Sequence, residues 1–169
     1  MLRRPHDYMR VNAIVACVSA FLWLTACSSR EDAAPPPAGV DLELGRKVYV
    51  RVCQECHMPE GQGQVGVVPP LADSPVLRVA DTRPLIRIVL HGLQGPIDIK
   101  GKRFNGVMPG QGAKLNDAEI ASVLSHVRAT WAGGAPAIDP YDVRNERMFY
   151  ASRTMPWNWY DLKRLFKLP

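Results

Sequence analysis

The sequence is poor in the features that would place it in several common classes of protein. Its 169 residues hold only four cysteines. Cys17 lies in an apolar N-terminal run and Cys27 ends that run, whereas Cys53 and Cys56 belong to the motif described next, so none remains for a structural disulfide. The net charge of +5 comes without a dense basic stripe and interleaved aromatic residues, so we expect no nucleic-acid partner. No internal repeat is visible. The length therefore predicts one modest domain with extensions.

One motif, Cys53-Gln54-Glu55-Cys56-His57, carries the chemistry of the chain. C-x-x-C-H is the attachment site of a c-type haem. Two thiols add across the two vinyl groups of the porphyrin, and the imidazole that follows lies below the iron as the proximal ligand. C-x-x-C alone also occurs in zinc sites and redox dithiols, but the sequence has no second Cys/His cluster and no βαβ pattern around the motif. We therefore expect one covalent haem c.

The N-terminus has the form of an export signal. Residues 1–10 are basic, and a mostly apolar run of 16 residues from Val11 to Ala26 follows. A membrane span needs roughly 20 apolar residues, so this run is short for one. It ends in Leu24-Thr25-Ala26-Cys27, which resembles the lipobox of bacterial lipoproteins, where the cysteine carries diacylglycerol. Residues 1–26 are predicted to be a lipoprotein-type signal peptide, with an ordinary cleaved signal or an uncleaved span as alternatives.

A lipidated Cys27 would tether the protein to a membrane. Each buried CH₂ group of an acyl chain contributes roughly 0.8 kcal/mol, so several chains would hold it there. Residues 27–40 are predicted to be the lipidated cysteine and a Pro-rich linker. We expect a haem domain at 41–132 and a tail with an aromatic cluster at 133–169. The expected location is the periplasmic side of the cell membrane or the outer membrane.

Hydrophobic periodicity predicts a helical haem domain. The spacing of apolar residues indicates helices over 41–52, 81–91 and 116–131. The last of these has the clearest start, because Asn116 and Glu119 approximate a capping box.

The segments between these helices are rich in glycine and proline. Residues 58–80 are predicted to be a loop, and residues 95–112 are predicted to contain a small hairpin that turns at Lys100-Gly101. In the tail, the apolar residues Leu162 and Phe166 suggest a short terminal helix.

A six-coordinate haem needs a second axial ligand on the face opposite His57. The residues considered for this role are Met58, Met108, Met148, Met155, His91 and His126. Met58 is adjacent to the proximal ligand and does not reach the other face. A lone methionine is usually a core residue. Met108 is nevertheless favoured, because a Gly-rich, Pro-flanked loop is suited to wrap the ring edge and deliver its sulfur.

These residues together resemble those of a class I cytochrome c. The similarity rests on Gly45 to Tyr49, on the Cys53 to His57 motif, on Pro69-Pro70-Leu71, on Asn105 to Pro109 and on the capped helix at 116–131. It covers about residues 41–132 and is strongest to the monohaem modules that serve bacterial dehydrogenases, oxidases and nitrite reductases. The resemblance implies an all-α fold of three to five short helices wrapped around one covalently bound haem.

The resemblance also implies roles for individual residues. The carbonyl of Pro69 would accept a hydrogen bond from the other nitrogen of the proximal histidine, and Leu71 would pack on the haem. Gly45 and Tyr49 would face the helix predicted at 116–131, near His126. The family usually has an aromatic residue at the position of His126.

The first functional hypothesis is an electron carrier and not an enzyme. With both axial positions filled by His57 and Met108, no substrate binds the iron, which cycles between its ferric and ferrous states. Such a protein meets a dehydrogenase, an oxidase or another cytochrome in brief encounters. The side chains considered for docking are those of Lys47, Lys100, Lys102 and Arg103. A solvated surface explains each of them equally well.

Two alternatives stay open at this point. The tail contains Trp157, Trp159 and Tyr160, residue types that anchor interfaces, which would suit a permanently bound cytochrome subunit of a dehydrogenase, oxidase or reductase. The same residues are equally explained by a tail that packs back on the haem domain. The other alternative is a haem enzyme or gas sensor in which Met108 is a labile ligand.

Overall fold

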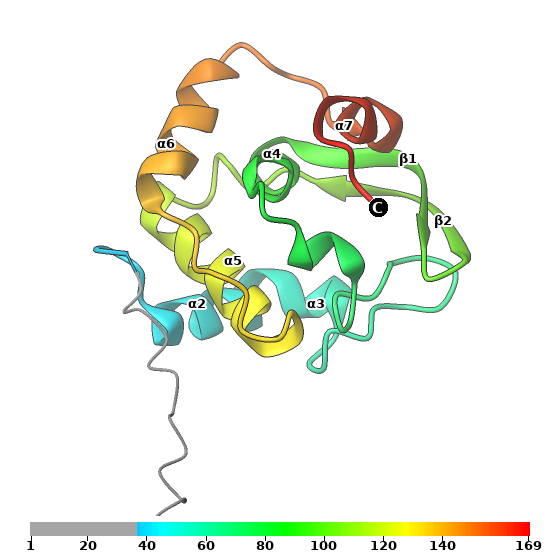
Figure 1. Cartoon of the computed structure of the whole chain (residues 1–169), viewed down its shortest axis with the longest axis horizontal. Helices are drawn as coiled ribbons and strands as arrows, with labels where there is room; N and C mark the ends of the chain where they lie inside the picture. Colours follow the sequence, from blue (N-terminus) through cyan, green and yellow to red (C-terminus); the bar gives the residue numbers. More distant parts are fainter. Residues whose placement is uncertain (1–36) are drawn as a thin grey trace, which may run out of the picture. The chain divides into compact units, whose positions relative to one another are not determined.

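The computed structural model describes residues 37–169. The predicted signal peptide, Cys27 and most of the predicted linker lie outside these residues. The described chain is mostly helical, as expected, and carries one small three-stranded sheet (Figure 1). Within this part of the chain, no helix is both long enough and apolar enough to cross a membrane.

The C-x-x-C-H motif follows a short helix whose backbone widens before the first cysteine. Helix α2 (Leu42–Val48) begins after Asp41, whose side chain accepts hydrogen bonds from two amides of the first turn. The next turn, Tyr49–Cys53, is π-helical, and α3 (Gln54–His57) completes the motif. The helix predicted over 41–52 is therefore present, but its second part is π-helical instead of α-helical. Single π-helical turns often occur inside helices at functional sites.

Helix α2 crosses helix α5 (Asp117–Trp131) closely at Gly45. A Cβ atom at this position would lie 2.6 Å from the carbonyl carbon of Ser122, so only glycine fits. The neighbouring Tyr49 ring has its centroid 6.1 Å from that of His126 and 5.3 Å from that of Trp131. The expectation that Gly45 and Tyr49 face this helix is confirmed.

Two longer helices build the core beside the motif. Helices α4 (Arg83–His91) and α5 (Asp117–Trp131) occupy the predicted ranges. The capping box at the start of α5 is complete: the Glu119 amide donates to the Asn116 side chain at 2.9 Å, and the Asn116 amide donates to the Glu119 carboxylate at 3.0 Å. Local hydrogen bonds therefore fix the start of α5, as the sequence predicts.

The predicted hairpin is present and is longer than expected. Strands β1 (Gly92–Ile99) and β2 (Lys102–Pro109) pair antiparallel along their whole length. Lys100 and Gly101 form the turn with φ values of 52° and 73°, as a two-residue type I′ turn requires. Met108 was predicted to lie in a loop, but it lies near the end of β2, where the strand ladder fixes its position.

The predicted loop at 58–80 is mostly irregular and contains one short 3₁₀ helix, Pro75–Arg78. Within this helix, Val76 and Leu77 are buried and join the hydrophobic core. A segment rich in proline and glycine thus contributes to the core without forming a long helix or strand.

The C-terminal tail folds back on the rest of the described chain. Helix α6 (Pro140–Phe149) packs on α4 and α5. Strand β3 (Trp157–Asn158) joins the sheet beside β1 in parallel, and α7 (Trp159–Phe166) follows against β1 (Figure 1). The terminal helix was predicted from the sequence, whereas α6 and β3 were not.

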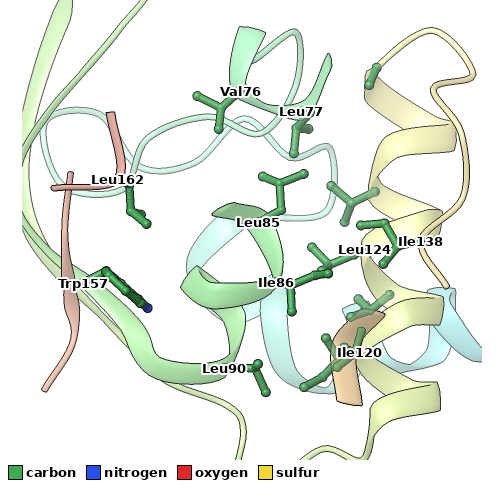
Figure 2. Packing of buried hydrophobic residues seen from close by; sticks show 14 of the residues in the cluster. Val76, Leu77, Leu85, Ile86, Leu90, Ile120, Leu124, Ile138, Trp157 and Leu162 are labelled. Atoms are coloured by element: carbon green, nitrogen blue, oxygen red, sulfur yellow. The ribbon is translucent and has the colours of Figure 1, made fainter. Parts of the chain in front are cut away.

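The tail aromatics divide into buried and exposed residues. Trp157 and Trp159 are 4% and 3% exposed and belong to the core, whereas Tyr160 is 55% exposed. Figure 2 shows Trp157 and Leu162 from the tail on one side of α4 and Leu124 of α5 on the other. Of the two explanations left open for these aromatics, packing on the domain holds for both tryptophans.

Candidate functional site

An apolar slot between α4, α5 and β1 reaches the C-x-x-C-H motif. It encloses about 800 Å³, including the space at its open mouth. Its walls are aliphatic side chains from these three elements and from the 3₁₀ helix, and no Asp, Glu, Lys or Arg of residues 37–169 lines it. Such a lining suits a largely apolar ligand that is held away from water.

His57 and Met108 are shared by the slot and two further hollows. Both residues line the slot, and both also line each of the adjoining hollows. His57 ends α3, whereas Met108 lies in β2 and pairs with Leu93 of β1. An imidazole and a thioether from two different elements therefore border the same three hollows.

The two thiols line the same set of hollows. Cys53 lines the slot and the second hollow, and Cys56 lines the second and third hollows. Burial raises the pKa of the Cys53 thiol to about 11, and the neighbouring Cys56 adds to this effect. Both cysteines are free. Two free thiols, three positions apart in the chain, thus lie at the edge of these hollows.

The buried side of the His57 ring lies near Pro69. Burial lowers the pKa of His57, and a backbone interaction with Pro69 opposes part of this change. The buried Nδ1 atom nevertheless makes no hydrogen bond of good geometry within the described chain. Nδ1 of His57 is therefore a buried donor without a partner among residues 37–169, and the Pro69 backbone lies beside the same ring.

Comparison with known proteins gives this site a family. Residues 42–131 match the cytochrome c family. Cytochrome c-552 of Thermus thermophilus is 38% identical over 117 residues, which cover 66% of this chain and 88% of the relative. The chain belongs to the cytochrome c family. As a member of this family, the protein carries covalent haem c and is an electron carrier rather than an enzyme.

The cytochrome is also similar to parts of larger proteins. The cytochrome c subunit of gluconate 2-dehydrogenase from Pantoea cypripedii is 35% identical over 100 residues, which cover 59% of this chain and 22% of that subunit. The cytochrome c subunit of quinone alcohol dehydrogenase from Gluconobacter oxydans is 33% identical over 117 residues, or 68% of this chain and 24% of that subunit.

The residues of the cytochrome fit a covalently bound haem. The slot is apolar, two free thiols with the C-x-x-C spacing lie at its edge, and the buried Nδ1 of His57 makes no hydrogen bond within the described chain. Each residue predicted to bind the cofactor lines at least one of these hollows: Cys53, Cys56, His57, Pro69, Leu71 and Met108. Their individual roles in binding the haem stay predictions.

The other residues considered as axial ligands lie away from these hollows. His91 and His126 line none of the three. Met148 and Met155 are 70% and 61% exposed on the surface of the tail. Among the residues considered, Met108 is the one that lines the same hollows as His57.

Trp159 lines the slot and was not predicted as a site residue. It lies in the tail, far from the haem motif in sequence. The sequence signal for it is the concentration of aromatic residues near the C-terminus. That pattern predicts either a protein interface or packing on the domain, and it does not point to the site.

The charges considered for docking are mostly paired with nearby carboxylates. Ion pairs join Lys47 to Glu43 at 3.9 Å, Lys100 to Asp73 at 3.4 Å and Arg103 to Asp98 at 3.0 Å. All of these side chains are largely exposed, so each pair contributes little to stability. The pairing reduces the net positive charge that these residues present to a partner.

Proposed function

We propose that this cytochrome transfers single electrons through a haem held by His57 and Met108. The supporting observation is that these two side chains, from α3 and β2, border all three hollows, each of which is also lined by one or both cysteines. The bound haem supplies a one-electron couple between ferric and ferrous iron. With His57 and Met108 both holding the iron, no position on the metal would remain for a substrate.

The surrounding residues would favour a high reduction potential. The aliphatic walls from α4, α5 and β1 exclude water, and a low dielectric disfavours the additional positive charge of the ferric state. The thioether of Met108 acts in the same direction. The Pro69 carbonyl would accept a hydrogen bond from Nδ1 of His57 and so fix the orientation of the imidazole.

Replacing Met108 tests the proposed ligation. The ferric Met108→Ala holoprotein should lose the methionine-to-iron charge-transfer band, and its ferrous form should bind carbon monoxide. The matched control is Met148→Ala, because Met148 is 70% exposed and lines none of the hollows. This control should retain the band. A Met108→Ala spectrum identical to that of the wild type would exclude Met108 as the ligand.

We further propose that the cytochrome is exported and held by lipid on the periplasmic side of the cell membrane or outer membrane. The support is the sequence of residues 1–27, with its basic start, apolar run and Leu24-Thr25-Ala26-Cys27 ending. Cys27→Ala should release a haem-containing protein from the membrane fraction. Cys17→Ala, a change within the apolar run, should leave it bound. Retention of the Cys27→Ala protein in the membrane would contradict the lipid anchor.

A second candidate function is that of a stable subunit of a dehydrogenase complex. It is favoured by the similarity to cytochrome c subunits of gluconate and quinone alcohol dehydrogenases. Redox proteins are the expected partners in either case. Mild detergent extraction followed by native size separation distinguishes the two: a free carrier migrates alone with its haem, whereas a subunit migrates with dehydrogenase activity.

A further inference from the structure

The wall of the haem slot includes one residue from outside the family match. The match ends at residue 131, whereas Trp159 lies at the start of α7 and lines the slot. This side chain is only 3% exposed. The tail therefore does more than cover the domain from outside, because it supplies part of the inner surface against which a haem would pack.

Hydrogen bonds on both sides fix the position of Trp159. Immediately before it, β3 pairs with β1, with Trp157 opposite Leu93 and Asn158 opposite Gln94. The Asn158 side chain then caps α7 by accepting a hydrogen bond from the backbone amide of the second helical residue at 2.9 Å. Trp159 is thus placed between a strand that is paired and a helix that is capped.

Arg87 of α4 contacts the rest of the tail through an ion pair and cation–π interactions. Its guanidinium bonds the Glu146 carboxylate of α6 at 2.5 Å, and both side chains are largely buried. The same guanidinium lies over three tail rings, 4.4 Å from the centroid of Tyr150, 4.6 Å from that of Phe166 and 5.3 Å from that of Trp157. A cation above the face of an aromatic ring is attracted to that ring, most strongly where water is excluded. Arg87 therefore stabilises the packing of α6, β3 and α7 against α4.

We propose that Trp159 is a haem-pocket residue that closes the slot beside β1 and keeps water from the haem. A large indole at this position fills space that solvent would otherwise enter. Water near the iron would stabilise the ferric state, so Trp159 raises the reduction potential. The inference rests on the proposed function, because it takes the haem to occupy the slot between His57 and Met108.

The test compares Trp159→Ala with Tyr160→Ala in the full-length holoprotein. The two residues are neighbours on α7, but Tyr160 is 55% exposed and lines none of the hollows. Spectroelectrochemical titration gives the midpoint potential of each variant. Trp159→Ala should have a lower midpoint potential than the wild type, whereas Tyr160→Ala should match the wild type. Trp159→Phe keeps one ring and should fall between the wild type and Trp159→Ala.

The outcomes separate this inference from the proposed ligation. A wild-type ferric spectrum without the methionine charge-transfer band would overturn the ligation itself. With that band present, equal potentials in the wild type, Trp159→Ala and Tyr160→Ala would overturn the role of Trp159. If Trp159→Ala does not accumulate as holoprotein, Trp159→Phe decides: a lowered potential supports the inference and an unchanged one overturns it.

Discussion

Adding one methyl group at Gly45 tests the helix crossing that carries the haem motif. A Cβ atom there would lie 2.6 Å from the carbonyl carbon of Ser122 and 2.9 Å from Cβ of His126, although ordinary contact begins at 3.4 Å. Side-chain rotation does not relieve a clash with backbone atoms, so α2 must move away from α5. Overpacking costs up to about 3 kcal/mol, and the better helix propensity of alanine offsets about 1 kcal/mol. Gly45→Ala should therefore lower the free energy of unfolding by roughly 2 kcal/mol.

Guanidinium unfolding of the holoprotein, followed by circular dichroism, measures this loss. The control is Gly101→Ala in the hairpin turn, where φ is +73° and no atom lies within 4 Å of an added Cβ. This variant has only the strain of a left-handed backbone, roughly 1 kcal/mol. A loss for Gly45→Ala no greater than that for Gly101→Ala would refute the close crossing.

Two further predictions concern buried charge. Glu146→Ala leaves the Arg87 guanidinium buried without its carboxylate and should cost about 3–5 kcal/mol in the same unfolding assay. Burial lowers the pKa of His126 below its ordinary 6.5. The unfolded chain then binds the proton more readily, so stability is full above about pH 6.5 and falls as the pH drops toward the folded pKa. His126→Phe should remove this part of the decline.

The matched control for the buried pair is Asp81→Ala. This change breaks the exposed ion pair with Arg83 and should cost no more than about 1 kcal/mol. An equal cost for Glu146→Ala and Asp81→Ala would contradict the first prediction. Arg46 also lowers the pKa of His126, whereas Glu43 raises it. Stability curves for the wild type and His126→Phe that stay parallel between pH 7 and 5 would contradict the second.

Features governed by local hydrogen bonds were predictable from the sequence. The Asn116 and Glu119 capping box fixes the start of α5, and both partners lie within one helical turn. The turn at Lys100-Gly101 is likewise set by two neighbouring residues. Gly45 was informative for a different reason, because a glycine inside a helix needs an explanation and a close crossing supplies one.

Features that depend on distant contacts were missed. Strand β3 is two residues long and exists through pairing with β1, so its own sequence carries no signal. The role of Trp159 in the slot depends on the same long-range pairing.

Helix α6 was missed although a signal was present: Asp139 caps it and Pro140 occupies its first turn. The π-helical turn at 49–53 has an apolar spacing that is also compatible with an ordinary helix.

The ferric spectrum of the wild-type holoprotein at neutral pH tests the central claim most directly. If His57 and Met108 hold the iron in an electron carrier, the methionine-to-iron charge-transfer band is present and the ferrous protein does not bind carbon monoxide. A high-spin ferric spectrum, with rapid binding of carbon monoxide after reduction, would show an open axial position and contradict the account.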